Sequence, residues 1–91
     1  MAERLRLAVE GRVQGVGFRY ATYREAAARG LTGWVRNAYD GRVEAEFEGT
    51  REQLEAMLEW CWHGPRYAEV RNVHVEWCEG ESHYAQFEIL G

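Results

Sequence analysis

The sequence contains no lysine. All 11 of its basic residues are arginine, against 15 acidic residues, so the formal net charge is −4 and the isoelectric point about 5.4. An acidic surface disfavours broad, non-specific binding to nucleic acid, because the phosphate backbone attracts positive charge. A small anionic ligand is not excluded, since one local positive site can lie in a negative field. We therefore expect no nucleic-acid partner.

Cysteine is also scarce. The two cysteines, Cys61 and Cys78, cannot form the disulfide framework of a small secreted protein. If Cys61 ends a helix and Cys78 ends the following strand, about ten residues of strand at ~3.3 Å each separate them, more than a disulfide spans. We expect two free thiols.

Long apolar runs are missing as well. No stretch approaches the ~20 apolar residues that a membrane span requires, and the first four residues lack the apolar core of a signal peptide. The expected location is therefore cytoplasmic, with no membrane partner. A chain of 91 residues with one proline and no low-complexity tract predicts a single domain, 1–91, with one small core.

Side-chain periodicity predicts five strands and two helices. Alternating apolar residues mark the strands, and apolar residues at helical spacing or runs of alanine mark the helices. The order predicts an α+β fold, a ferredoxin-like sandwich of β-α-β-β-α-β with two helices on one face of an antiparallel sheet, plus a short last strand. The predicted strands are 5–10, 31–38, 43–48, 68–77 and 85–89, and the helices are 19–29 and 50–62.

Local signals support several boundaries. Gly30 is suited to end the first helix, and Thr50 with Gln53 forms a capping-box pattern before the second. The Asp40-Gly41 pair favours a hairpin between the second and third strands. Val70 is out of phase with the apolar residues that follow it, which predicts a bulge or an irregular start in the fourth strand.

The clearest alternation occurs in 43–48, where apolar residues alternate with Glu44, Glu46 and Glu48. A strand with this pattern has one buried face and one solvated face. We expect the glutamates to form a solvated strand face rather than a cation site.

The three histidines do not suggest a metal centre. His63, His74 and His83 are separated by 11 and 9 residues, spacings that match no common zinc motif. We expect surface or packing roles for all three, and no metal or cofactor.

The segment 11–19, Gly-Arg-Val-Gln-Gly-Val-Gly-Phe-Arg, lies between a predicted strand and a predicted helix. Gly15 and Gly17 allow positive φ and close approach of a ligand. The helix that follows offers the positive end of its dipole, and Arg19 can present two parallel donors to a phosphate. A glycine-rich turn with a solvated arginine is the alternative. The segment lacks the lysine and hydroxyl of a P-loop and the third glycine of a dinucleotide site.

A second candidate, Asn37, lies near the end of the second predicted strand, just before the Tyr39-Asp40-Gly41 turn. Asparagine is common at strand ends and turns. Periodicity alone therefore favours a structural role for Asn37 over a catalytic one.

Segments 11–19 and 33–44 together resemble the acylphosphatase family. The resemblance extends over essentially the whole chain, in its length, its element order, Gly64-Pro65 and the valine-rich fourth strand. It implies the ferredoxin-like sandwich already predicted from the pattern. It also implies hydrolysis of acyl phosphates to a carboxylate and inorganic phosphate. Because a carboxylate is a good leaving group, this reaction requires no metal or cofactor, and we expect a monomer.

The resemblance also implies roles for individual residues. Backbone amides of the loop after the first strand and the arginine that ends this loop bind phosphate, and Asn37 orients the attacking water. The implied catalytic residues are Arg19 and Asn37, and the implied phosphate-binding residues are Gln14, Gly15, Val16, Gly17, Phe18 and Arg19. The alternative is a non-catalytic module on the same fold that binds phosphate or carbamoyl phosphate.

Overall fold

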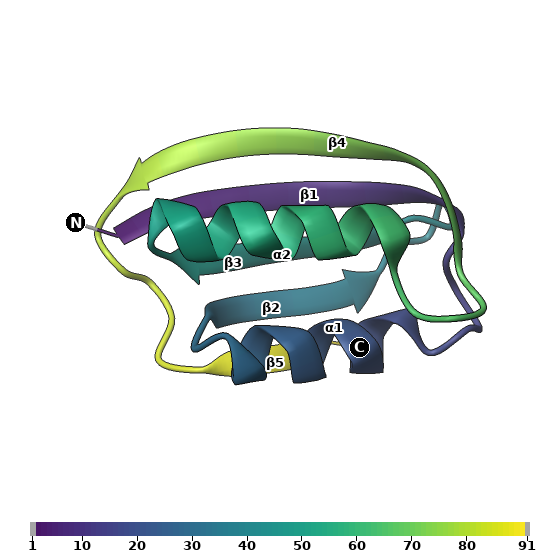
Figure 1. The fold of residues 1–91 in the computed structure, drawn as a ribbon, viewed down its shortest axis with the longest axis horizontal. Coiled ribbons are helices and arrows are strands. Elements are labelled where there is room, and N and C mark those ends of the chain that lie inside the picture. Colours follow the sequence, from purple (N-terminus) through teal and green to yellow (C-terminus); the bar gives the residue numbers. More distant parts are fainter. Residues whose placement is uncertain (1, 91) are drawn as a thin grey trace.

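A five-stranded sheet carries both helices on one face in this computed structural model, which describes residues 2–90 (Figure 1). The strand order is β4-β1-β3-β2-β5. The predicted ferredoxin-like sandwich is confirmed. In chain order the elements are β1 (Ala2–Arg12), α1 (Phe18–Ala28), β2 (Thr32–Asn37), β3 (Val43–Gly49), α2 (Arg51–His63), β4 (Glu69–Gly80) and β5 (Phe87–Leu90).

The sheet is mixed, whereas the sequence pattern predicted an antiparallel one. β1 pairs antiparallel with β3 and β4, and β2 pairs antiparallel with β3. β5 pairs parallel with β2. The connection from β4 returns the chain across the sheet to the end where β2 begins, so β5 runs in the same direction as β2 (Figure 1).

α2 begins, and α1 ends, at the signals that the sequence contains. The Thr50 hydroxyl accepts a hydrogen bond from the Gln53 amide at 3.2 Å, and the Gln53 side chain accepts one from the Thr50 amide at 2.9 Å. This is the predicted capping box. After α1, the Gly30 amide donates to the Ala27 carbonyl at 3.1 Å, which satisfies a carbonyl at the helix end.

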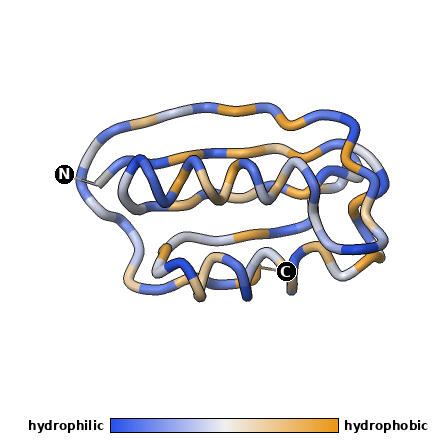
Figure 2. The backbone as a smooth tube through the Cα atoms, viewed as in Figure 1, coloured by the Kyte–Doolittle hydropathy of each residue, from blue (hydrophilic) through white to orange (hydrophobic). Residues whose placement is uncertain are grey.

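The core lies between the helices and the sheet. Figure 2 shows the alternation of apolar and polar residues along the strands that directs one set of side chains toward the helices. The side chains with less than 2% exposure include Leu5, Val9, Phe18, Val35, Val43, Phe47, Leu54 and Met57. Neither helix in residues 2–90 has the length and apolar character to cross a bilayer.

Both cysteines are free thiols, as predicted. Cys61 lies in the core and Cys78 is exposed. Burial raises the pKa of the Cys61 thiol, so this group stays protonated and packs as a small apolar side chain. The three histidines are exposed, in agreement with the surface role expected for them.

β4 contains the irregularity that the phase of Val70 predicted. Glu10 of β1 lies opposite Asn72, whereas Gly11 lies opposite Val70. Arg71 is therefore the extra residue of a β-bulge, and the strand side chains change phase at this point.

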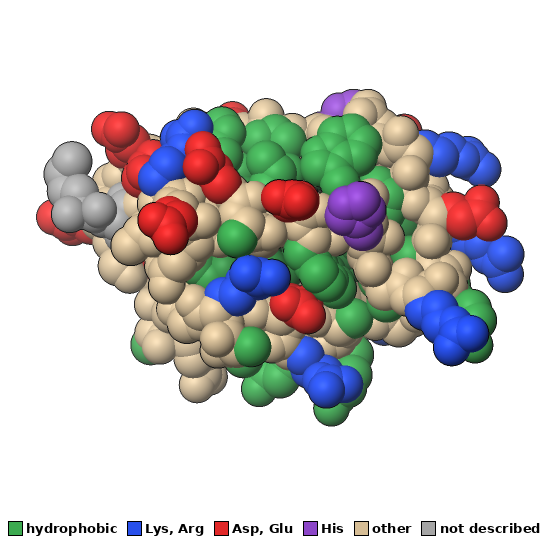
Figure 3. Space-filling model, in the orientation of Figure 1, with side chains coloured by type: hydrophobic (Ala, Val, Ile, Leu, Met, Phe, Trp, Pro, Cys, Tyr) green, Lys and Arg blue, Asp and Glu red, His purple; other side chains and the backbone are tan. Residues whose placement is uncertain are grey.

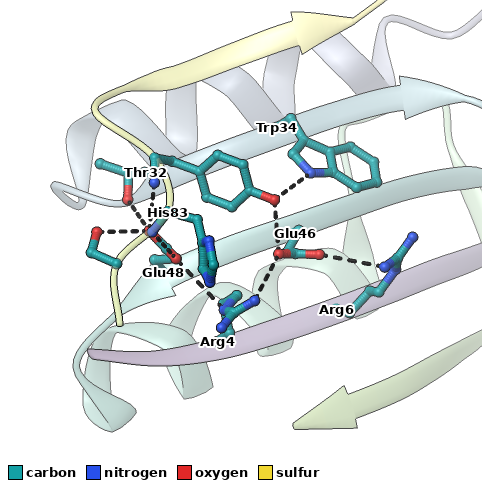
Figure 4. Close-up of polar contacts among 9 residues, drawn as sticks. Arg4, Arg6, Thr32, Trp34, Glu46, Glu48 and His83 are labelled. Carbon is teal, nitrogen blue, oxygen red and sulfur yellow. Dashed lines mark hydrogen bonds and ion pairs between the residues drawn. The ribbon is translucent and has the colours of Figure 1, made fainter. Parts of the chain in front are cut away.

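The expectation of a solvated acidic face on β3 is wrong for two of its three glutamates. Glu46 is 7% exposed and Glu48 is 3% exposed. Both lie on the sheet face opposite the helices, where the β4–β5 connection, residues 81–86, packs over them (Figure 4). The alternation along β3 shows which side chains face away from the helices. It does not show that a distant segment covers them.

Glu48 binds the β4–β5 connection directly. Its carboxylate accepts hydrogen bonds from the Ser82 hydroxyl at 2.9 Å, the His83 amide at 2.8 Å and the Tyr84 amide at 3.1 Å. Thr32 of β2 donates a fourth bond at 3.2 Å. Burial raises the pKa of Glu48, but the hydrogen bonds outweigh it and hold that pKa below its ordinary value of 4.5.

Glu46 extends the same network toward β1 and β2. Its carboxylate accepts a hydrogen bond from the Tyr84 hydroxyl at 2.9 Å, and this hydroxyl accepts one from the Trp34 indole at 3.1 Å. Arg4 and Arg6 form ion pairs with Glu46 at 3.7 and 3.6 Å (Figure 4). The buried charge is therefore paired and hydrogen-bonded, as a buried carboxylate requires.

Protonation of Glu48 is expected to weaken the attachment of residues 81–86. Because its folded-state pKa lies below 4.5, the contribution to stability is present above that pH and is lost as the pH falls through the folded-state pKa. Glu48→Gln should lower the free energy of unfolding at neutral pH by about 1–3 kcal/mol and flatten its fall in acid. Urea unfolding at a series of pH values measures both effects.

Glu59→Gln is the matched control, since Glu59 is an exposed residue of α2. It should leave the free energy of unfolding at neutral pH unchanged. A Glu48→Gln variant with the pH dependence of the parent chain would show that Glu48 contributes nothing to acid unfolding.

Candidate active site

The loop after β1, the start of α1 and the end of β2 meet at one end of the sheet, on the right in Figure 1. A pocket of about 230 Å³ lies between them. Five of the residues expected at the site contribute to its wall, together with three that the sequence did not assign. The lining residues are Val13, Gly15, Gly17, Phe18, Arg19, Tyr20, Asn37 and Ile89.

The two glycines give the loop its concave backbone. Gly15 has φ +75° and Gly17 has φ +79°, both in the left-handed region, and Gly17 directly precedes α1. Amides in such a turn point toward a common centre, and the first amides of a helix have no partner within the helix. A Cβ at either glycine would meet no atom within 4 Å. The space beside the loop is thus open to a ligand.

Arg19 lies in the first turn of α1, and its half-buried side chain lines the same pocket. A guanidinium at this point adds a permanent positive charge to the positive end of the helix dipole. The loop and Arg19 together make an electrostatically favourable position for an anion.

Asn37 is the last residue of β2 and pairs with Val43 of β3. Its Oδ1 is buried and has no hydrogen-bond partner within residues 2–90. The turn that follows is closed by a different side chain, because the Asp40 carboxylate accepts the Arg42 amide at 3.0 Å. This hydrogen bond lowers the pKa of Asp40. The turn-forming role considered for Asn37 therefore belongs to Asp40, and the Asn37 Oδ1 is available to a ligand.

Two of the expected phosphate-binding residues lie outside the pocket wall. Val16 packs against the core. The side chain of Gln14 is directed at the β2–β3 hairpin, where it donates to the carbonyls of Ala38 at 2.8 Å and Arg42 at 3.0 Å. A contribution of Gln14 or Val16 to phosphate binding would therefore come through the backbone amide.

Ile89 is a pocket residue that the sequence did not identify. It belongs to β5 and lies opposite Val35 of β2. Its position beside the glycine loop depends on the crossover from β4, for which the local sequence carries no signal. Tyr20, the residue after Arg19, completes the rim and is 61% exposed.

The pocket is suited to hold an anion and orient a neutral reactant. Among the described residues that line it, none carries a carboxylate, an imidazole or a thiol. Residues 2–90 also contain no group of three or more His, Cys, Asp or Glu arranged to hold a metal ion. Acidic and basic side chains are interspersed on the helix-bearing face of the molecule, which shows no extended basic patch (Figure 3).

A sequence profile of the acylphosphatase family matches residues 5–89. The chain belongs to the acylphosphatase family. It is 50% identical over 86 residues to an acylphosphatase of Pelotomaculum thermopropionicum, with 94% of each chain covered. It is 60% identical over 73 residues to an acylphosphatase of a Nostoc species, with 80% of this chain and 72% of the relative covered. The resemblance seen in the sequence is confirmed, and the chain is an enzyme of this family.

Solved structures agree with this assignment. The fold is similar to the crystal structure of acylphosphatase from Bacillus subtilis, with a TM-score of 0.94, 38% identity and coverage of 98% and 99% of the two chains. It is also similar to part of full-length HypF in its phosphate- and nucleotide-bound form, with a TM-score of 0.89 and 28% identity. This match covers all of the present chain and 12% of HypF.

Gly17→Ala tests whether the loop backbone forms an anion site. The substitution introduces no clash, but a left-handed φ destabilises an alanine by about 1–2 kcal/mol, so the loop should relax and bind inorganic phosphate more weakly. Gly41→Ala is the matched control, because Gly41 has φ +94° with no atom within 4 Å of a Cβ and lies outside the pocket wall.

We expect both variants to lose similar stability in urea and only Gly17→Ala to lose phosphate affinity in a calorimetric titration. Equal phosphate affinity in Gly17→Ala and the parent chain would contradict an anion site at this loop.

Proposed function

We propose that the chain hydrolyses the carboxyl-phosphate bond of acyl phosphates by direct attack of a water molecule that Asn37 orients. The observation that carries the proposal is the common pocket. A glycine loop suited to an anion lies beside an asparagine whose buried Oδ1 has no partner within residues 2–90. Membership of the acylphosphatase family supports the same reaction.

In this proposal the loop and Arg19 hold the phosphoryl group. Backbone amides of residues 14–18 donate to its oxygens, and the guanidinium of Arg19 donates two parallel hydrogen bonds. Phosphoryl transfer is accelerated mainly by positioning and by stabilisation of charge on the equatorial oxygens. Because the donors belong to the backbone and to a helix terminus, they need little reorganisation during the reaction.

Asn37 holds the attacking water on the side of the phosphoryl group opposite the leaving oxygen. Its carbonyl oxygen accepts a hydrogen bond from the water, so a lone pair of the water oxygen is directed at phosphorus. Such orientation lowers the activation free energy, because the reacting atoms are already in place before the reaction begins. An amide does not act as a base near neutral pH, so Asn37 orients the water without deprotonating it.

The leaving group explains how the reaction proceeds with so few catalytic groups. The water oxygen forms a bond to phosphorus, and the bond between phosphorus and the acyl oxygen breaks with its electron pair retained by the carboxylate. The acid of this carboxylate has a pKa of about 4, so it leaves without a proton donor. The proton of the water passes to an oxygen of the phosphate product.

Separate substitutions of Arg19 and of Asn37 should distinguish phosphate binding from turnover. Arg19→Gln removes a charge-assisted pair of hydrogen bonds and should weaken phosphate binding by about 10-fold to 100-fold, with loss of turnover. Asn37→Ala should reduce kcat by about 100-fold or more and leave the inhibition constant of inorganic phosphate unchanged. Benzoyl phosphate hydrolysis with phosphate as inhibitor measures both quantities.

Matched controls are available on the same fold. Arg24→Gln changes an exposed arginine of α1, and Asn72→Ala changes an exposed asparagine of β4, so neither should affect turnover. Full activity in Asn37→Ala would eliminate the water-orienting role, and parental phosphate affinity in Arg19→Gln would eliminate the binding role.

Two measurements test the proposed mechanism further: metal removal tests whether a cation takes part, and a phosphate monoester tests the need for a good leaving group. Hydrolysis of benzoyl phosphate should continue at the same rate in excess EDTA, because the proposed charge stabilisation comes from Arg19 and the loop amides. Phenyl phosphate, whose phenolate is a poorer leaving group, should be hydrolysed far more slowly. Strict dependence on an added divalent cation would contradict this mechanism even if acyl phosphates were hydrolysed.

A further inference from the structure

We propose that the side chain of Gln14 is a positioning residue, which sets the place of Asn37 relative to the phosphate-binding loop. The proposal rests on the proposed function, because it assigns to Gln14 the alignment of the two halves of that site. It gives Gln14 a role in turnover that is separate from any contribution of its backbone amide to phosphate binding.

The geometry places the Gln14 amide group at the base of the β2–β3 hairpin. Nε2 donates to the carbonyl of Ala38 at 2.8 Å and to the carbonyl of Arg42 at 3.0 Å. These two residues close the hairpin, since the Ala38 amide also donates to the Arg42 carbonyl at 2.8 Å. Gln14 thus holds both sides of the turn, and one of its two acceptors is the residue directly after Asn37.

The two halves of the site come from strands that are not neighbours. The glycine loop follows β1, Asn37 ends β2, and β3 lies between these strands. Val43 of β3 pairs with Val9 of β1 and with Asn37 of β2, so backbone pairing links the two halves only through β3. Within the described residues, the Gln14 bonds are the only side-chain hydrogen bonds that join loop 13–17 directly to hairpin 38–42.

Gln14 acts through another residue rather than on the substrate. Its side chain does not contribute to the pocket wall, although Gly15 and Asn37 on either side of it do. The side-chain amide is half-buried and directed at the hairpin carbonyls. Loss of the donor should therefore displace Asn37 while the loop amides and Arg19 keep their positions.

The expected consequence is a loss of turnover without a loss of phosphate affinity. A displacement of about 1 Å in a group that orients a reactant can reduce the rate by about 100-fold. Gln14→Met keeps the length of the side chain and the backbone amide but removes the donor. We expect kcat for benzoyl phosphate to fall by about 10-fold to 100-fold, with the inhibition constant of inorganic phosphate unchanged.

The matched control is Gln86→Met, because Gln86 is exposed and its side chain, among the described residues, hydrogen-bonds to Glu88 alone, at 3.4 Å. This control should keep the parental kcat. Gln14→Asn serves as a second variant if Gln14→Met does not fold. Its amide is shorter by one methylene and cannot reach both carbonyls, so the same separation of kcat from phosphate affinity is expected.

A double-variant comparison distinguishes positioning from general damage to the fold. If Gln14 acts through Asn37, Gln14→Met should cause no further loss of kcat in an Asn37→Ala chain, whereas a merely structural defect would lower the residual rate again. An additive loss would overturn the proposal, and so would parental kcat in Gln14→Met or a loss of phosphate affinity equal to its loss of kcat.

The outcomes also separate this inference from the function on which it depends. If Asn37→Ala keeps full activity, the proposed function fails, and the role of Gln14 fails with it. If Asn37→Ala is impaired and Gln14→Met is not, the proposed function stands and only the positioning role is lost.

Discussion

The pairing of β3 with both of its neighbours is the constraint on which the site depends. Val43 lies opposite Val9 of β1 and opposite Asn37 of β2, so one row across the sheet joins the strand that leads into the glycine loop to the end of the strand that carries the asparagine. Because side chains alternate along a strand, a slip of one residue would turn Val43 out of the core and move Asn37 out of line. The buried residues of β3 therefore hold the geometry of the site as well as the core.

The two sides of the pocket differ in the groups that they present: backbone amides and a charge on one side, and a neutral side-chain amide on the other. On one side, positive-φ glycines and a helix terminus aim fixed backbone dipoles at one point, and Arg19 adds charge. On the other side, the buried Oδ1 of Asn37 has no hydrogen-bond partner within residues 2–90, and the Asp40 side chain closes the turn that follows. A loop suited to an anion thus lies beside an asparagine oxygen with no partner within residues 2–90, which is the arrangement that the proposed reaction uses.

The sheet face opposite the helices also supports the site, although Glu46 and Glu48 on this face do not line the pocket. Glu46 and Glu48 bind the β4–β5 connection through Ser82, His83 and Tyr84. That connection leads into β5, whose Ile89 forms part of the pocket wall. These two buried carboxylates thus tie the connection that precedes β5 to β3, which links the packing of this face to the shape of the pocket.

The sequence by itself determined the elements, the fold class and the glycine loop with its arginine, because these depend on local periodicity, caps and backbone freedom. It also carried the family resemblance. Tertiary structure decided what depends on contacts between distant segments: the burial of Glu46 and Glu48, the parallel pairing of β5, the position of Ile89, and the direction of the Gln14 side chain toward Ala38 and Arg42. An alternating pattern shows which way a side chain faces, but only the folded chain shows what it meets there.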